Sequence, residues 1–436
     1  MDYIRGAAGL MFIIALAYLF SGNRKFVDWR LVLMGLTIQL IFGLIISKVD
    51  FAQHVFGYVS QKFVIFLGFA QKGGEFLFGD LAKNSNGNPD VKHNLGFLFI
   101  FQALPTVVFF SAFTAGLYYL GILQKIVLVF AWIMARTMRL SGSESLSVAA
   151  NIFVGQTEAP LLVRPFIPTM TKSELHTLMV GGMAHISGSV LGAYVALLGG
   201  GDPAQQAKFA SYFLAASIMN APAAIILSKL FIPQSEPDKI DRELKINQER
   251  IGVNLIDALA RGASDGMKLA INIAAMLLAF IAIIYVINWV MVDFIGAYTG
   301  LNDFVVSSTG GTFKGFSLQY ILGQGFRVFA FIMGVEWSET LSVGSLLGQK
   351  MVINEFVAYL DLASMKTAGV LSDKSIRIAT YALCGFANFS SIAIQIGGIG
   401  GMAPTRQGDI SRLGFRAMIA ATLATMMTAT IAGVIF

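Results

Sequence analysis

Long apolar segments constrain this chain more than any other feature of its sequence. The run AMLLAFIAIIYVINWVMV, residues 275–292, carries no charged side chain. Its length is close to the roughly 20 residues that a helix needs to cross a bilayer. Of the 436 residues, 56% are hydrophobic and only 13% are charged, whereas a soluble domain carries about a quarter charged residues. The sequence therefore predicts an all-α polytopic membrane protein.

Eight segments are apolar enough to be membrane-spanning helices. They lie near residues 6–21, 30–47, 95–121, 175–199, 207–232, 266–291, 376–397 and 412–435. Two further apolar regions, 141–171 and 334–366, are interrupted by polar residues, and the first also by three prolines. Because proline ends or kinks a helix, we expect these two regions to be re-entrant hairpins rather than straight spans.

Basic residues orient the predicted spans. Lys and Arg gather near residues 23–30, 125–139, 233–250 and 406–416, which fall on one side if the spans alternate, and we assign that side to the cytoplasm. The Asn- and Gly-rich stretch 83–90 then faces outward, and residues 52–80 suit a helix lying in the outer interface. This bias explains the net charge of +6 without a nucleic-acid partner.

The first apolar segment is expected to be a retained span with its N-terminus outside. Arg24, Lys25 and Arg30 follow this segment, whereas only Arg5 precedes it, which is opposite to the charge order of a signal peptide. Cleavage after residues 15–17 is the alternative.

An internal repeat indicates how the chain is organised. SESLSV at 143–148 recurs as SETLSV at 338–343, and each copy is followed by a glutamate, Glu158 or Glu355, and by a span with a polar interruption. The interruptions are HISGS at 185–189 and NFSS at 388–391. We expect an inverted repeat with broken helices, as in many secondary transporters.

The repeat divides the chain into scaffold and transport domains. We expect scaffold helices with an outer interfacial helix in residues 1–121, and a cytoplasmic segment with a further scaffold helix in 233–291. The first transport-domain repeat is expected in 122–232, as a hairpin (141–171), a broken helix (172–199) and a helix (207–232). The second is expected in 317–435, as a hairpin (334–366), a broken helix (374–397) and a helix (409–435).

The stretch FVGQTEAPLLVRP, residues 153–165, places a carboxylate and two prolines in apolar surroundings. A carboxylate at the bilayer centre costs around 3 kcal/mol on insertion scales, and irregular backbone survives there only inside protein or beside a water-filled cavity. Gly155 allows a tight turn, and Pro160 removes one backbone donor. The stretch therefore predicts a hairpin tip at a binding site.

Polar residues of the two repeats form one candidate site without a positive charge. Amides and hydroxyls both donate and accept, whereas ionised carboxylates only accept. The set suits a neutral ligand rich in N–H and O–H groups, such as a nucleoside. Structural roles are the competing interpretations: an ion pair between Glu158 and Arg164, a loop position for Glu355, and helix packing for Asn388 and Ser391. The candidate residues are Gln156, Thr157, Glu158, Glu355, Asn388 and Ser391.

Three motifs, GQTEAPLLVRP, NEFVAYL and GFANFSSIAIQIGG, resemble the concentrative nucleoside transporter family, and the resemblance runs from about residue 5 to 435. It implies eight transmembrane helices, two opposed re-entrant hairpins, a homotrimer held by the scaffold, and a transport domain that moves as an elevator. The expected function is nucleoside import by ion symport.

The resemblance also assigns roles to individual residues. Gln156, Thr157 and Glu158 would contact the nucleobase, and Val190 would line the base pocket. The ribose would be held by a second group, Glu355, Asn388 and Ser391, with Phe386 beside it.

The sodium site that the resemblance implies lies between the first hairpin tip and the first broken helix. Asn151 would supply a side-chain oxygen, and Val154 and Ile186 would supply carbonyls, which are the oxygen ligands that hard cations prefer. His185 departs from the family pattern, since Ser or Thr often stands there; its own carbonyl remains a possible ligand. Sodium is the favoured coupling ion, proton coupling through His185 is the alternative, and a packing role is the third interpretation.

Other function classes find little support in the sequence. Cys384 is the only cysteine, so no intrachain disulfide or cysteine metal site can form. HExxH, GxSxG and Walker A patterns are absent, and four histidines are scattered. No covalent cofactor is expected. A channel, or a membrane enzyme acting through Glu158 and Glu355, is a distant alternative. A bacterial inner membrane is the expected location, and purine or pyrimidine preference stays open.

Overall fold

A computed structural model describes residues 2–83, 97–244 and 252–436. Across these residues the elements are helical, and six helices are long and apolar enough to cross a membrane. Within the described residues, each of the eight predicted spans contains one helix or two consecutive helices, and residues 95 and 96 of the third span lie outside these residues. Residues 84–90 of the predicted outward stretch and 245–250 of the predicted cytoplasmic segment lie outside the described residues.

The N-terminal part consists of helices that the sequence pattern predicts well. Asp28 starts the second helix by accepting hydrogen bonds from the backbone N–H groups of Arg30 and Leu31, which are unpaired in the first turn of any helix. The predicted interfacial helix at 52–80 is also helical. The elements are α1 (Asp2–Leu19), α2 (Trp29–Lys48), α3 (Asp50–Phe78), α4 (Phe99–Gln102) and α5 (Leu104–Tyr119).

The first half of the predicted transport domain, residues 122–232, begins with a helix that we did not expect. The sequence suggested a basic connecting region around 125–139, yet α6 (Ile122–Met138) forms there and packs on the hairpin through its apolar face. The following elements are α7 (Gly142–Asn151), α8 (Ala159–Leu162), a 3-10 segment at Arg164–Thr169, α9 (Lys172–Ala184), α10 (Gly188–Gly199) and α11 (Pro203–Phe231).

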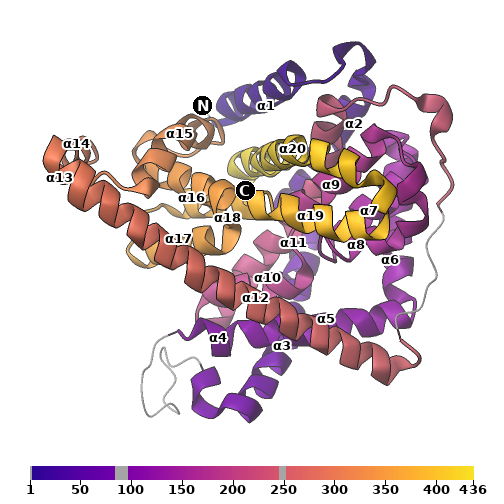
Figure 1. The fold of residues 1–436 in the computed structure, drawn as a ribbon, viewed down its shortest axis with the longest axis horizontal. Helices are drawn as coiled ribbons and strands as arrows, with labels where there is room; N and C mark the ends of the chain where they lie inside the picture. The colour runs from indigo at the N-terminus through magenta and orange to yellow at the C-terminus, as the bar shows by residue number, and fades with distance from the viewer. Residues whose placement is uncertain (1, 84–96, 245–251) are drawn as a thin grey trace.

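A long helix separates the two halves. α12 (Leu255–Trp289) crosses the molecule diagonally in Figure 1 and packs along α5. A π-helical segment, Val290–Gly296, follows, and then α13 (Ala297–Thr299) and α14 (Leu301–Ser308). Most side chains of α12 are exposed in the single chain, so its apolar surface is available to lipid or to another subunit.

The second half, residues 317–435, repeats the element order of the first. A helix packs on a hairpin, a broken helix follows, and a long helix closes the unit. These elements are α15 (Leu318–Ile332), α16 (Thr340–Val352), α17 (Glu355–Thr367), α18 (Asp373–Leu383), α19 (Phe389–Met402) and α20 (Gln407–Ile435).

The glutamates of the repeated SExLSV motifs cap helices. Glu144 forms a capping box with Ser141 at the start of α7 and a buried ion pair with Lys229. Glu339 accepts hydrogen bonds from the backbone N–H and hydroxyl of Ser372, where α18 begins. In both copies of the motif, the glutamate therefore accepts hydrogen bonds at the start of a helix, where backbone N–H groups have no partner within the helix.

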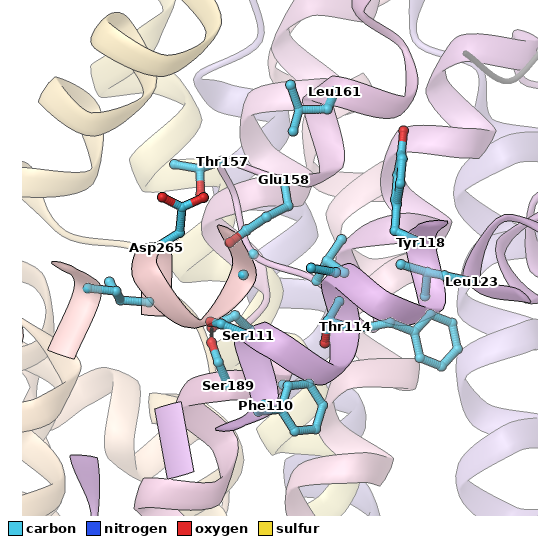
Figure 2. A pocket seen from close by; sticks show the side chains of 18 of the residues that line it. Phe110, Ser111, Thr114, Tyr118, Leu123, Thr157, Glu158, Leu161, Ser189 and Asp265 are labelled. Carbon is cyan, nitrogen blue, oxygen red and sulfur yellow. Dashed lines mark hydrogen bonds between the residues drawn. The ribbon is translucent and has the colours of Figure 1, made fainter. Parts of the chain in front are cut away.

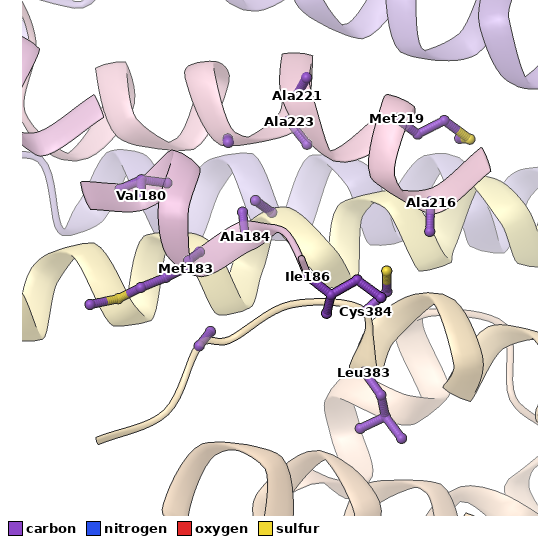
Figure 3. Close-up of a cluster of buried hydrophobic side chains, with 14 of the residues drawn as sticks. Val180, Met183, Ala184, Ile186, Ala216, Met219, Ala221, Ala223, Leu383 and Cys384 are labelled. Carbon is purple, nitrogen blue, oxygen red and sulfur yellow. The ribbon is translucent and has the colours of Figure 1, made fainter. Parts of the chain in front are cut away.

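The breaks of the two broken helices lie against each other in the centre of the bundle. The backbone N–H of Phe386 donates to the carbonyl of His185 at 3.3 Å. A side chain on Gly385 would lie only 3.0 Å from the carbonyl carbon of Ala184, so glycine permits the approach. Figure 3 shows Ala184 and Ile186 of one break beside Leu383 and Cys384 of the other, under α11.

Asn220 of α11 joins both breaks. Its side-chain amide donates to the carbonyls of Ala184 and Cys384, each at 2.8 Å. These carbonyls belong to the orphan acceptors that every helix end leaves, and in a dry interior they need a protein donor. Asn220 therefore holds the two breaks in register.

We expect Asn220→Ala to lower the stability of the protein by about 1–3 kcal/mol, because two buried carbonyls lose their donor. The measurement is thermal unfolding in detergent, followed by tryptophan fluorescence. Ser211→Ala, at a half-buried position of the same helix, is the control and should leave the midpoint unchanged. Equal midpoints for the two variants would contradict this account of the crossing.

Candidate functional site

The tip of the first hairpin lies against the first helix break. α7 ends at Asn151 and α8 begins at Ala159, so residues 152–158 form the turn. The N–H of Gly188, the first residue of α10, donates to the carbonyl of Phe153 at 3.3 Å. A side chain on Gly155 would lie 3.1 Å from the Cβ of Ser187. The absence of a side chain at Gly155 thus lets the tip sit directly on the break.

A cavity of 360 Å³ opens beside this tip. Thr157 and Glu158, both exposed, line it from the hairpin, and Ser187 and Ser189 line it from the broken helix. The opposite wall comes from α5 and α12, and Asp265 of α12 faces Thr157 and Glu158 in Figure 2. The cavity therefore lies between the first half and the helices that we assign to the scaffold.

The tip of the second hairpin carries a buried carboxylate. Glu355, 3% exposed, begins α17 and accepts hydrogen bonds from the Tyr194 hydroxyl and the Asn388 amide, both at 3.0 Å. Asn388 also caps α19 by accepting from the N–H of Ser391 at 2.8 Å. One asparagine thus fixes both the start of the helix and the position of the carboxylate.

A chain of amides connects the two halves. The Gln156 amide donates to the Ser391 hydroxyl at 3.1 Å, and the Gln156 oxygen accepts from Gln395 at 3.2 Å. Gln395 is anchored in turn on the carbonyl of Met179 at 3.0 Å. The first hairpin tip is thereby bonded to α19, although these residues are more than 200 positions apart in the sequence.

Most of the predicted ligand-binding residues either form hydrogen bonds with one another or line the cavity. Thr157 and Glu158 face the cavity, whereas the predicted ribose residues do not line it. Val190 is 2% exposed and lies in the first turn of α10. Phe386 is half-buried within the second break.

Three residues near the site escaped the sequence analysis. Tyr194 lies one helical turn after Val190, and Gln395 lies one turn after Ser391, so helical spacing from the predicted residues would have found both. Asp265 belongs to a different element, and no motif links it to the hairpin tip.

The implied cation site fits one feature of the first hairpin. The side-chain oxygen of Asn151 is buried and has no hydrogen-bond partner among the described residues, while its amide donates to the carbonyl of Ser147 at 2.9 Å. A buried acceptor without a donor is unusual in proteins, and a bound cation would satisfy it. Val154 and Ile186, 5% and 1% exposed, are also buried near the tip and the break. In the described residues no cluster of His, Cys, Asp and Glu suits a transition metal.

His185 serves its own helix end. Its Nδ1 lies 2.7 Å from the carbonyl of Gly181, and because a carbonyl only accepts, Nδ1 carries the proton. The ring therefore satisfies one of the orphan acceptors at the end of α9. The carbonyl of His185 already accepts from Phe386. One ring nitrogen thus has a structural role, whereas Nε2 is buried without a hydrogen-bond partner among the described residues.

Three family models match the chain. They are described as the C-terminus of a Na+ dependent nucleoside transporter, over residues 212–433, its N-terminus, over residues 8–81, and a nucleoside-recognition segment, over residues 100–201. Together they cover the scaffold helices and both halves of the predicted transport domain.

Relatives and solved structures agree with these matches. An uncharacterized transporter of Bacillus subtilis, YutK, is 41% identical over 99% of both chains. Mouse sodium/nucleoside cotransporter 1 is 39% identical over 98% of this chain and 63% of its own. The inward-facing, substrate-bound structure of CNTnw is 38% identical and covers 100% of this chain and 98% of that one, with a TM-score of 0.86. A CNTnw variant in an outward-facing state gives 0.87 at 38% identity, with the same coverage.

The lone cysteine makes the cavity testable by labelling. Cys384 is fully buried, so the native protein should resist a water-soluble maleimide. We expect Thr157→Cys to be labelled readily, because Thr157 is exposed on the cavity, and Val190→Cys to be labelled at least about tenfold more slowly, since a thiol must reach water to react. Mass spectrometry of the intact protein measures both rates. Similar rates at the two positions would contradict the described cavity.

Proposed function

Because the chain belongs to the concentrative nucleoside transporter family, we propose that it imports nucleosides by symport with sodium ions. The family and its structural neighbours are nucleoside transporters rather than enzymes. The observation that carries the proposal is the hydrogen-bonded polar set at the two hairpin tips, in which Glu355 and the Gln156–Ser391 pair are held by other neutral groups. Such a set offers donors and acceptors to a neutral polar solute.

We assign the two parts of the nucleoside to the two hairpins. Gln156, Thr157 and Glu158 present an amide, a hydroxyl and a carboxylate to the base, with Val190 as an apolar wall. The second hairpin and its broken helix supply the acceptor for a ribose diol, which can donate to Glu355 in place of Tyr194 or Asn388. Ser391 and Phe386 complete this side.

Sodium is the coupling ion in this proposal. The free oxygen of Asn151 supports it, and we assign the carbonyls of Val154 and Ile186 as further ligands, with the carbonyl of His185 at the edge of the site. A cation held there would join the first hairpin tip to the first break and thereby stabilise the nucleobase residues. Since His185 Nδ1 is used at the end of α9, its side chain has no assigned part in coupling.

We further propose that both halves move together as one transport domain within a homotrimer, in a bacterial inner membrane. Hydrogen bonds between the two halves support joint motion. Arg406 donates to the carbonyls of residues 167, 168 and 170, and Lys366 donates to the carbonyl of Leu198. The cavity between the hairpin tip and α12 lies at the boundary along which the transport domain would move against the scaffold. The exposed apolar faces of α3 and α12 suit contacts between subunits.

Uptake of labelled uridine into proteoliposomes tests the function. A sodium gradient should drive accumulation, whereas a proton gradient without sodium should not. Accumulation driven by protons alone would contradict sodium coupling. Failure of uridine and of every other nucleoside under both gradients would contradict the nucleoside assignment itself.

Removing the free oxygen should weaken sodium coupling. We expect Asn151→Leu, which keeps the side-chain size, to lower the apparent sodium affinity of uridine uptake about tenfold or more, since loss of even an outer-shell partner of a metal ligand commonly costs this much. Ser147→Ala, one turn earlier on the same buried helix face, is the control and should keep the native sodium dependence. An unchanged sodium dependence in Asn151→Leu would exclude the assigned site.

The Tyr194 hydroxyl should matter for ribose recognition. We expect Tyr194→Phe to weaken uridine binding by about three- to tenfold, because Glu355 loses one of the donors that position its carboxylate, while binding of a 2′,3′-dideoxynucleoside changes little. Glu355→Gln should be more severe than Tyr194→Phe. Tyr212→Phe, at a half-buried tyrosine of α11, is the control. Equal losses for both ligands in Tyr194→Phe would indicate a general packing defect instead.

A further inference from the structure

The second half of the transport domain contains a buried lysine that the proposed function does not use. Lys350 is 1% exposed and lies in the last turn of α16, five residues before Glu355. A buried ammonium is costly unless it is paired and hydrogen-bonded. Its position directly before the second hairpin tip therefore requires an explanation.

Lys350 is bonded to the second helix break. Its ammonium donates to the carbonyl of Ala382 and to the hydroxyl of Thr425, both at 2.9 Å. Ala382 belongs to the last turn of α18, whose carbonyls have no partner within the helix. The negative end of the helix dipole lies at the same place. Lys350 thus connects the second hairpin with the end of α18 and with α20.

The carboxylate of Glu355, at the start of α17, follows Lys350 by five residues in the chain. Lys350 and Glu355 are 1% and 3% exposed, so charges on these two side chains would be surrounded by protein rather than water, where screening is weak. Tyr359, on the same helix as Glu355, ties this region to α18 again, because its hydroxyl donates to the carbonyl of Thr380 at 2.9 Å. The second half therefore contains one buried basic side chain, Lys350, and one buried acidic side chain, Glu355, next to its hairpin tip.

The first half differs at the end of the helix that leads to its hairpin tip. The last turn of α7 ends with Asn151, a neutral residue whose oxygen lacks a donor. In the described residues Glu158, the carboxylate of the first tip, has no ion pair with a basic side chain. The tip of the first hairpin therefore presents acceptors without a cation, although Lys229 and Arg406 bond to other parts of this hairpin. Beside the second tip, Lys350 is a cation that already has its acceptors.

We propose that Lys350 is the resident cation of the second half: its ammonium braces the second break and balances Glu355, so that the ribose side of the site forms without a bound ion. This inference rests on the proposed function, in which a mobile sodium ion completes the first half. It makes Lys350 a positioning residue that acts through Glu355. It also confines the ion dependence of nucleoside binding to the hairpin that contains Asn151.

Thermal unfolding without nucleoside or sodium tests the charge balance directly. Removing one member of a buried charge pair destabilises a protein strongly, whereas removing both is often tolerated. We expect Lys350→Met to lower the unfolding midpoint, and Lys350→Met combined with Glu355→Gln to regain at least half of that loss. Lys229→Met, which removes the buried partner of Glu144, is the control lysine and should not be rescued by Glu355→Gln.

Additive losses in the Lys350 pair would overturn the proposal and leave Lys350 as a brace alone. If Lys350→Met does not accumulate in membranes, the double variant decides. A double variant that folds supports the charge balance, whereas a double variant that is equally absent contradicts it.

Uridine binding separates this inference from the proposed function. In Lys350→Met we expect the preference for uridine over 2′,3′-dideoxyuridine to fall by about tenfold, the loss expected when a charge-assisted hydrogen bond to the ribose weakens. The sodium concentration for half-maximal binding should stay native. A shifted sodium dependence with an intact ribose preference would contradict the assignment of Lys350. Absence of any sodium effect in the native protein would contradict the proposed coupling and leave the unfolding test unaffected.

Discussion

Free backbone groups at interrupted helices are the constraint on which the rest of this structure depends. Lipid offers no hydrogen bonds, so a helix that stops inside the membrane must have its last carbonyls and first N–H groups satisfied by protein or by bound solutes. Both broken helices meet this need with protein side chains, most of which come from distant segments. Asn220 serves both breaks, His185 serves the end of α9, and Lys350 and Tyr359 serve the end of α18. These hydrogen bonds supply donors to the carbonyls that the ends of α9 and α18 leave free.

Two features of the first hairpin support the proposed solute sites. The oxygen of Asn151 is buried without a donor, and the exposed Thr157 and Glu158 face a cavity. On the opposite hairpin the polar groups are paired with one another, and a ligand must exchange those bonds rather than add new ones. The two hairpin tips differ in charge, and this difference is the physical basis of the proposal that an ion is required at the first tip only.

The sequence predicted the helical class and the apolar segments that form helices, because apolar length is a local signal. The hairpins and the division into domains, which were inferred from proline placement and an internal repeat, stay predictions. Among the predicted binding residues, Gln156 is hydrogen-bonded to Ser391, and Asn388 is hydrogen-bonded to Glu355. α6 was missed because its charged residues, Lys125 and Arg136, resemble those of a loop, although its apolar face packs inward. Asp265 and Lys350 could not be placed, since their meaning depends on which distant segments the fold brings beside them.

Equilibrium binding of uridine to the purified protein, with sodium and with choline in its place, tests most directly whether an ion completes the first hairpin tip. The account predicts that sodium raises the affinity for uridine, and that uridine raises the affinity for sodium by the same factor, since coupling between two sites is reciprocal. Equal uridine affinity in sodium and in choline would contradict it.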